Sequence, residues 1–497
     1  MSKIIEEKDV VIANLQKQVH LLEEQLSYLK RMMFGKKKET VIDDGIELPN
    51  FVMPEQPEIA QEETPLEEEV EVKGYKKKRK PFTRFEFPQD APREEIIIDL
   101  PEEEKKGLKY IGDDIVEKLA FRPGSFYVKV YITKKYADLI HPEEGVKVNH
   151  SLHPAIPKSR VDESMLAHLL INKYCDHLPL YRLEGIYRRD GLKIGRQTLS
   201  SWALQAGELL TPIAELLLEY IMSQKVVFTD DTTVPLQAKG NGKTKTARMW
   251  VYVGGGGADP PLVYYEFTED RKNCHPIKKF KDYQGAFHSD AFSAYEKIAM
   301  FEGVTWQACW AHARRKFFDC LTSHPLKNST LKKIDELFAI EREVWNVDKE
   351  DLSKEDSSFR RTEIRKNKSN MIVDEIFRTL KDSVKTGVHM PKEGLTKAIA
   401  YLLKRETYFR SFLTNSELRI DNNVSERNIK PLVLGRKNWL FVGSSDGGKT
   451  TATILSLVQT CKNLNINPQE YLEDILSKIN GTSKEDFFTL LPQNWKK

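Results

Sequence analysis

The chain has 497 residues, of which 40% are hydrophobic and 10% aromatic, so it can fill several small cores and is not a fully disordered protein. It contains no apolar run near the ~20 residues of a membrane span and no signal-peptide-like start, which predicts a cytoplasmic protein without a membrane partner. Its five cysteines are too few and too scattered for a disulfide framework, and a net charge of +3 does not by itself demonstrate a polyanionic partner.

Residues 1–35 carry a heptad pattern of apolar side chains. One core position is mostly β-branched and the other is leucine: Ile5, Ile12, Val19, Leu26 and Met33 at the first, and Leu15, Leu22 and Leu29 at the second. This distribution favours a parallel two-stranded coiled coil. We therefore predict an oligomerisation arm and a homo-oligomer, with an amphipathic helix folded back on its own protein as the alternative.

Residues 36–80 lose this periodicity and switch between acidic and basic runs, which predicts a charged, flexible linker. Its basic cluster, Lys76–Lys80, can touch DNA phosphates, but a solvated charge run is the simpler interpretation. Residues 81–150 then hold short β-like stretches, such as Glu95–Leu100 and Phe126–Tyr131, and we predict a small β-rich module there.

Residues 151–222 have a helical pattern. One helix is expected to stop at Asp190-Gly191, and a second is expected to begin near Arg196 and Gln197. Two helices joined by a short Gly-containing turn suit a helix-turn-helix-like DNA-binding region, with polar residues near the start of the second helix. A helical hairpin that binds nothing is the alternative.

Residues 223–324 change to strand-like sequence. KVVFTDD, ARMWVYVGG and PLVYYEF are separated by Gly/Pro-rich turns, which predicts an antiparallel meander. A helix over Pro276–Asp282 and two further strands, GAFHSD and VTWQACW, are expected to follow. This segment is the predicted first part of a mixed α/β core.

Residues 325–414 are charged and helix-forming, which predicts a helical insertion into that core. Residues 415–450 are expected to complete the core with a helix around Asn423–Asn428 and a strand, NWLFVG, and residues 451–497 form a helical tail. The sequence therefore predicts a multidomain α/β protein.

Acidic residues lie at the ends of elements in the predicted core. Asp230 and Asp231 are expected to end its first strand, Asp290 its fourth, and Glu426 lies in the helix after the insertion. Three converging carboxylates would bind Mg²⁺ and leave positions for phosphate oxygens and water, as phosphoryl transfer needs. Taken singly, each acid is an ordinary surface group.

Several long motifs resemble the large transposase of the insertion-sequence-66 family. They occur in order across residues 225–475 and include FTDDTTV, FHSDAFSAY, WQACWAHARRKFFD and LRIDNNVSERNIKPLVLGRKNWLFVGS. YRLEGIYRRDGLKIGRQTLSSW resembles the family's upstream segment, and the predicted coiled coil fits the family pattern too.

The resemblance implies a ribonuclease-H-like catalytic core with a DDE triad. By motif match, the catalytic and metal-holding residues are Asp230, Asp290 and Glu426, with Asp231 as the alternative first acid. It further implies Mg²⁺ as cofactor, with Mn²⁺ able to substitute. In the family mechanism, metal-activated water frees a 3′-hydroxyl at the element end, and that hydroxyl then attacks a target phosphodiester.

Basic residues lie close to these acids in the sequence, as expected of a protein that holds DNA phosphates near metal-binding carboxylates. Together with the helix-turn-helix-like residues, the predicted DNA contacts are Arg196, Gln197, Arg314, Arg315, Lys316, Arg427, Lys430, Arg436 and Lys437. The expected partners are double-stranded DNA (the element's inverted repeats and the target), a second copy of the chain and, by resemblance, small accessory proteins of the element.

Family members commonly carry a cysteine-based zinc module after the coiled coil. This chain has no cysteine before Cys175, so no zinc is expected there. Cys309 and His312 form a C-x-x-H pair without two further ligands at suitable spacing, and we interpret the pair as structural.

Gly443–Thr450, GSSDGGKT, matches the phosphate-binding pattern G-x-x-x-x-G-K-[ST]. Only 47 residues follow Thr450, too few for the rest of such a fold, so we interpret the match as spurious. The sequence thus predicts a nucleoid-associated bacterial DNA transposase. A catalytically inactive DNA-end-binding protein with the same fold is the first alternative, and an ATP-dependent enzyme is the second.

Overall fold

The structure is a computed structural model that describes residues 126–129, 135–137, 146–148, 154–157, 159–238, 243–255, 259–321, 324–347, 352–386 and 394–496. The predicted coiled coil, the linker and the stretch Glu95–Leu100 lie outside the described residues. The chain divides into two units, and the elements below all belong to the unit that contains Val128–Lys497.

The β-rich module is described only in fragments. β1 (Lys135–Ala137) pairs antiparallel with β2 (Val146–Val148). The predicted strand Phe126–Tyr131 is wrong where it can be examined, because residues 126–129 are not in a strand. Alternation of apolar and polar residues over so short a run is a weak signal.

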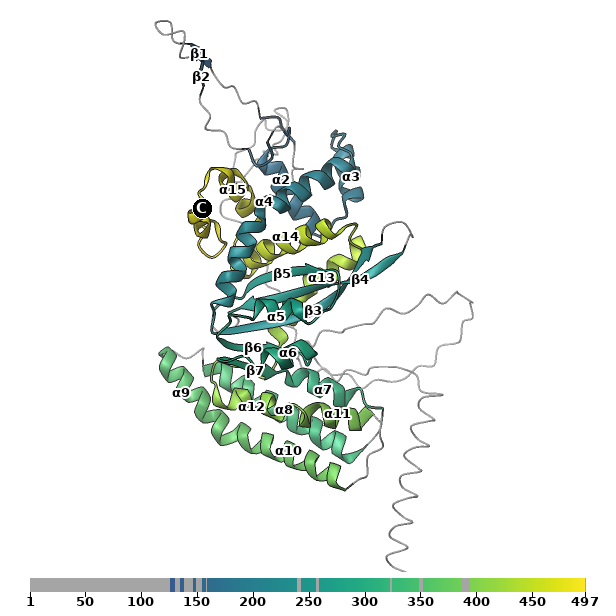
Figure 1. The fold of residues 1–497 in the computed structure, drawn as a ribbon, viewed down its shortest axis with the longest axis vertical. Helices are drawn as coiled ribbons and strands as arrows, with labels where there is room; N and C mark the ends of the chain where they lie inside the picture. Colours follow the sequence, from purple (N-terminus) through teal and green to yellow (C-terminus); the bar gives the residue numbers. More distant parts are fainter. Residues whose placement is uncertain are drawn as a thin grey trace, which may run out of the picture. The chain divides into compact units, whose positions relative to one another are not determined.

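A five-stranded mixed sheet forms the centre of the fold (Figure 1). Its order is β5-β4-β3-β6-β7, with β3 Val226–Gln237, β4 Thr244–Gly254, β5 Leu262–Thr268, β6 Gly285–Ser289 and β7 Val304–Ala308. β3, β4 and β5 form an antiparallel meander, whereas β6 and β7 join β3 in parallel. The five strands predicted within residues 223–324 are confirmed.

β3 is longer than the sequence predicted. It pairs with β4 from Val227 to Gln237, so Asp230 and Asp231 lie inside the strand rather than at its end. The sequence analysis placed the end of the strand at these two adjacent acids. The strand continues because β4 forms hydrogen bonds with the backbone of β3 beyond them.

The two faces of the sheet are covered by different helices. α5 (Cys274–Lys279) and α6 (Ser293–Ile298) pack on one face, drawn in front of the sheet in Figure 1. Aromatic rings fill this layer in the pairs Trp250–Phe292, Tyr252–Phe280 and Phe287–Tyr295. The other side contacts α4 (Arg196–Met222) and α13 (Asn423–Trp439).

Helix α14 (Ser445–Asn463) covers the free edge of β5. The backbone N–H of Val263 donates to Thr460 Oγ1 at 3.0 Å, and that of Tyr265 donates to Ser456 Oγ at 2.8 Å. Hydroxyls of the helix therefore satisfy backbone donors that an edge strand would otherwise leave open.

The predicted strand NWLFVG is wrong. Helix α13 continues through Trp439, and of the residues after it only Val442 forms an isolated bridge, with Leu236 of β3. Buried residues recur along the helix at helical spacing: Val424, Asn428, Leu432 and Gly435. That periodicity, rather than the short apolar run at the end of the helix, decided the local structure.

The helical region before the sheet contains α2 (Glu163–Leu170), α3 (Leu180–Arg189) and α4. α3 ends where predicted, and Gly191 after it has φ +87°, a conformation that glycine adopts without strain. α4 begins at Arg196 as predicted and runs for 27 residues. One face of its later turns is buried, from Leu199 to Ile221, while the first turn is exposed.

The segment predicted as a helical insertion follows α7 (Trp310–Phe318) and is helical where it is described. It consists of α8 Pro325–Asn346, α9 Lys354–Ile364, α10 Asn370–Lys385, α11 Gly394–Leu403 and α12 Glu406–Thr414. In the tail, α15 (Pro468–Lys478) packs on α2. Within the described residues, every helix is too short or too polar to cross a membrane.

Candidate active site

The pairing of β3 with β6 places two acids side by side. Phe228 is in register with His288, and their rings stack with centroids 4.3 Å apart on one face of the sheet. Side chains alternate between faces along a strand, so residues two positions further along both strands return to that face. Asp230 and Asp290 are those residues, and Asp290 directly follows the end of β6.

Glu426 reaches the same place from α13, whose first turn contains it. The residue just before this helix, Asn422, donates its side-chain amide to the backbone oxygen of Thr229 at 3.0 Å. Its backbone N–H points to Cys309 Sγ at 3.2 Å. The start of α13 is thereby fastened to β3, immediately beside Asp230.

The three carboxylates interact electrostatically. Burial raises the pKa of Asp230 well above its usual value, and the charges of Asp290 and Glu426 raise it further, against the backbone N–H of Asp231. Burial also raises the pKa of Asp290, while the N–H of Phe292, at 3.0 Å, lowers it. Negative charge is therefore concentrated here without full compensation, which is the condition under which a cation binds.

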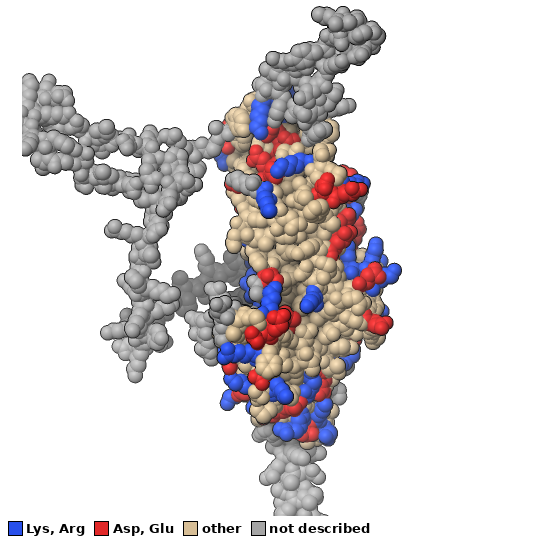
Figure 2. Space-filling model, turned by 90° about the vertical axis from the view of Figure 1, so that its left-hand side faces the viewer, with Lys and Arg blue, Asp and Glu red and all other residues tan. Residues whose placement is uncertain are grey.

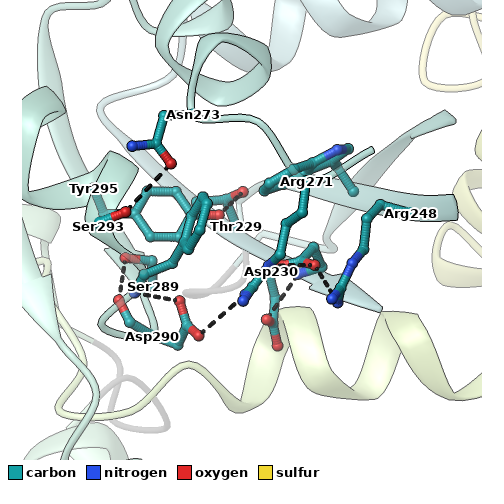
Figure 3. Close-up of polar contacts among 12 residues, drawn as sticks. Thr229, Asp230, Arg248, Arg271, Asn273, Ser289, Asp290, Ser293 and Tyr295 are labelled. Carbon is teal, nitrogen blue, oxygen red and sulfur yellow. Dashed lines mark hydrogen bonds and ion pairs between the residues drawn. The ribbon is translucent and has the colours of Figure 1, made fainter. Parts of the chain in front are cut away.

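Asp231 has a different environment. Its side chain is fully buried and pairs with Arg248 at 3.0 Å and Arg271 at 2.6 Å. Arg271 also lies 3.8 Å from Asp290 Oδ2 (Figure 3). Its guanidinium group lies over the ring of Phe292. The carboxylate of Asp231 thus has two cationic partners among the described residues, whereas Asp230 faces other carboxylates.

His312 and Arg315 lie beside Glu426. His312 Nε2 is 3.7 Å from Glu426 Oε1, and an Arg315 amino nitrogen is 4.0 Å from Glu426 Oε2. Burial lowers the pKa of His312, while the charge of Glu426 opposes that shift. Cys309, the other member of the C-x-x-H pair, is buried and contacts the backbone of Asn422.

The comparisons with known proteins identify the family of the chain. Residues 158–450 match the profile described as the IS66 transposase family. The chain belongs to that family. Residues 456–493 match the IS66 C-terminal element, and residues 21–96 match a profile described as the transposase C of IS166 homeodomain.

Relatives in Sinorhizobium fredii cover most of the chain. The uncharacterized protein y4qI is 35% identical over 441 residues, spanning 85% of this chain and 79% of the relative. The uncharacterized protein y4jD is 29% identical over 507 residues, spanning 98% and 96%. The likeness to these relatives thus extends beyond residues 158–450.

The structure brings some of the predicted DNA-contacting residues of this IS66-family chain toward the acids. Arg315 is within 4.0 Å of Glu426, and the charge of Lys316 lowers the pKa of Asp290. Arg314 turns away and pairs with Asp335 of α8 at 2.6 Å, so it faces the insertion instead.

The remaining candidates lie on two helices. Arg427, Lys430 and Lys437 are exposed on α13, whereas Arg436 donates to Thr233 of β3. Arg196 and Gln197 are exposed in the first turn of α4. On the face drawn in Figure 2, acidic and basic side chains are intermingled, most densely over the helical insertion.

Sequence reasoning missed four residues of this site. Arg248, Arg271 and Asn422 were not singled out, and His312 was interpreted only as structural. The spacing of the C-x-x-H motif directly after β7 was the available signal for His312, because that turn and the start of α13 meet at the same sheet edge. Nothing local marked the arginines.

The Gly443–Thr450 motif has no phosphate cradle. From Ser445 onward it is already helix α14, and Ser444 caps that helix by accepting from the N–H of Gly447. Gly448 is required for packing, since a Cβ there would lie 2.6 Å from the ring of Phe267. Lys449 points to Asp446 at 3.4 Å. The spurious match therefore has a packing explanation.

The family implies a divalent metal, and the donor set is suitable for one. Glu426 Oε1 is buried and has no hydrogen-bond partner among the described residues, and its oxygen chemistry suits Mg²⁺. In the described conformation, however, no three His, Cys, Asp or Glu side chains are grouped closely enough to hold an ion. Metal binding would thus require the acids to draw together.

Proposed function

We propose that this IS66-family protein is a DNA transposase that cleaves insertion-element ends and joins the freed 3′-hydroxyl to target DNA. The observation that carries the proposal is the convergence of Asp230 and Asp290 on one face of β3 and β6, with Glu426 held beside them through Asn422. Two further features suit a reaction on a phosphodiester. Burial raises the pKa of the Asp230 carboxyl, and the cationic side chain of Arg315 lies beside Glu426.

The topology supports a ribonuclease-H-like core, as the resemblance implies. An antiparallel meander is followed by two parallel strands on the side of the first strand, and a helix after the insertion supplies the third acid. In such an arrangement the insertion between Asp290 and Glu426 lengthens the chain without breaking the sheet.

We assign roles from position and chemistry. Asp230, Asp290 and Glu426 would hold Mg²⁺, or Mn²⁺ in its place. The bound metal would activate the attacking oxygen and stabilise the leaving oxygen. Arg315 and Lys316 would orient the phosphates beside the scissile bond. His312 would hold Glu426 in place from the other side of its carboxylate.

In this proposal, DNA contacts the exposed residues of α13, beginning beside the acids. It also contacts the start of α4. The match of residues 21–96 to a homeodomain-type profile supports a further DNA-binding segment there. Self-association through residues 1–35, accessory proteins of the element and association with the nucleoid belong to the same proposal.

The test is cleavage and joining of a DNA duplex that carries the gene's own flanking sequences, with Mg²⁺ or Mn²⁺. Wild type should produce metal-dependent 3′ nicks and joined products, and Asp290→Asn should produce neither. Asp282→Asn is the matched control, because Asp282 is an exposed acid outside the site.

Accessory proteins of the element should be included in parallel reactions. If wild type binds the ends but does not cut them in any combination, the DNA-end-binding alternative replaces the transposase. If Asp290→Asn cuts as well as wild type, the assignment of the triad is wrong.

A further inference from the structure

The turn that follows α13 exposes large apolar side chains. Leu440 is 64% exposed and Phe441 is 43% exposed, although both belong to the turn that returns the chain to the sheet. Six residues before Leu440, on α13 itself, Leu434 is 56% exposed. Apolar groups grouped in this way mark a binding surface more often than isolated exposed residues do.

The turn holds a strained backbone. Leu440 has φ 64° and ψ −50°, and the N–H of Phe441 donates to the oxygen of Trp439 at 2.8 Å. This is a γ-turn of the rare, strained kind. A bulky residue in such a conformation persists only where the surroundings enforce it, and such positions gather at functional sites.

Both ends of the turn are fixed. The N–H of Leu440 donates to Arg436 O at 2.8 Å, and the N–H of Val442 donates to Pro235 O of β3 at 2.8 Å. In addition, the N–H of Gln237 donates to Val442 O at 2.9 Å. Leu440 and Phe441 are therefore presented on a rigid support, not on a loose loop.

Exposed cationic side chains lie along α13 between the candidate active site and this turn. Starting one residue after Glu426, exposed side chains recur at helical spacing along one stripe of α13: Arg427, Lys430, Leu434, Lys437 and Asn438. Three of these five positions are cationic. At 1.5 Å rise per residue, the stripe places the turn about 20 Å from Glu426, a length of about six base pairs of DNA.

The stripe also meets the helix-turn-helix-like region. An Arg182 amino nitrogen of α3 donates to Asn438 Oδ1 at 3.5 Å. Tyr181, next to it, is 58% exposed. A duplex lying along α13 would thus pass from the three acids, over the apolar turn, toward α3.

We propose that Leu440 and Phe441 form an apolar wedge that enters the DNA duplex and unstacks a base about six base pairs from the cleaved bond. The proposal rests on the proposed function, because it requires DNA on α13. Apolar side chains flanked by phosphate-binding cations are the known means of prying base steps apart. A protein partner would instead favour an apolar surface depleted of lysine.

The wedge is tested by 2-aminopurine fluorescence, with the probe base placed at successive positions of a duplex carrying the gene's flanks. Full-length wild type should raise the fluorescence at one position near the expected distance. The double variant Leu440→Gly/Phe441→Ala should lose that rise and bind about tenfold more weakly, in line with the loss of base stacking. Glycine at 440 tolerates the positive φ, so the turn itself is retained.

Two controls separate the wedge from general binding. Phe488→Ala removes another exposed aromatic ring, 53% exposed and in the tail, and should change nothing. A mismatch at the unstacked position should restore the affinity of the double variant, because the wedge is then no longer needed to open the stack.

Failure of the wedge and failure of the proposed function give different results. If wild type cleaves DNA without unstacking any base, or if the double variant still unstacks it, the wedge is refuted and the transposase stands. If wild type unstacks a base but never cleaves, the wedge stands and the catalytic proposal fails. Absence of DNA binding would overturn both.

Discussion

Asp230 and Asp231 are adjacent in the chain, but β3 sends their side chains in opposite directions. Asp230 lies on the face shared with Asp290, whereas Asp231 is enclosed by Arg248 and Arg271. A carboxylate among other carboxylates is poorly stabilised in its charged form, and one between two guanidinium groups is well stabilised. The two residues should therefore respond oppositely to the same substitution.

Asp230→Asn should abolish cleavage while leaving the melting temperature unchanged or higher, because it removes a buried charge that Asp290 and Glu426 repel. Asp231→Asn should instead lower the free energy of unfolding by about 2 kcal/mol, because it removes the charge of a buried carboxylate that two partly exposed arginines bind. Thermal unfolding and duplex cleavage of both proteins check this. Loss of stability in Asp230→Asn would contradict the assignment of the first acid.

Lys173 supplies a second prediction at the residue scale. It lies in a π-helical turn, Ile171–Cys175, and burial lowers its pKa from 10.5 to about 8. At neutral pH both folded and unfolded chains carry the charge, and only the folded chain must bury it. Lys173→Met should therefore raise the free energy of unfolding by about 2 kcal/mol at pH 7.

The greater stability of Lys173→Met relative to wild type should decrease as the pH rises. Above pH 8 the folded wild type releases the proton before the unfolded chain does, so wild-type stability rises relative to the variant until about pH 10.5. Denaturant unfolding of both proteins across this range measures the difference. If the difference in free energy of unfolding does not change with pH, the pKa of Lys173 is not lowered in the folded protein.

At the scale of elements, α13 decides whether the third acid reaches the other two. Its start is tied to β3 by the amide of Asn422 and its far end by Arg436, which donates to Thr233. The helix thus spans the distance between the candidate active site and the apolar turn as one rigid support. Small displacements of its first turn would move Glu426 directly.

Asn422→Ala should reduce cleavage by about tenfold to a hundredfold while duplex binding stays unchanged, because the hydrogen bond to Thr229 O no longer positions Glu426. Asn428→Ala is the matched control. The side-chain amide of Asn428 donates to Val424 O within α13 and accepts from Asn463. The substitution therefore removes buried hydrogen bonds but none to β3. Equal loss of cleavage in both variants would refute the anchoring role.

At the scale of the whole described core, a buried arginine of the helical insertion holds the segment that leads back to the candidate active site. Arg365 pairs with Glu341 at 2.7 Å and is completely buried. It also donates to the backbone oxygens of Phe412, Asn415 and Leu418, at 3.0, 3.1 and 2.7 Å. These residues lead the chain from the insertion back toward Asn422 and Glu426.

Arg365→Met should lower the free energy of unfolding by about 3–5 kcal/mol, because it leaves the charge of Glu341 buried and unpaired. Adding Glu341→Leu should recover most of that stability, since an apolar pair can replace a buried ion pair. Cleavage should remain reduced in the double variant, because the three backbone oxygens still lack their donor. Recovery of cleavage together with stability would show that the insertion does not position the third acid.

Sequence patterns were sufficient where a signal is local. The strands of the sheet were recognisable from their apolar runs and bounding turns, and the end of α3 from Asp190-Gly191. Patterns failed at two points of the core, and only the first depended on a partner strand. β3 continues past Asp231 because β4 pairs with it, and residues 438–443 do not form a strand because helix α13 extends to Trp439.

The sequence by itself indicated the family motifs, the five strands and the candidate acids Asp290 and Glu426, with Asp230 and Asp231 as the two choices for the first acid. Only the tertiary structure distinguished Asp230 from Asp231, brought Asn422 to Thr229, and directed Arg314 away to Asp335. The physical reason is that residue type and period specify which local structure forms and what chemistry a side chain can perform. Proximity across 60 to 200 positions, and the burial that sets charge energetics, depend on how the strands and helices pack.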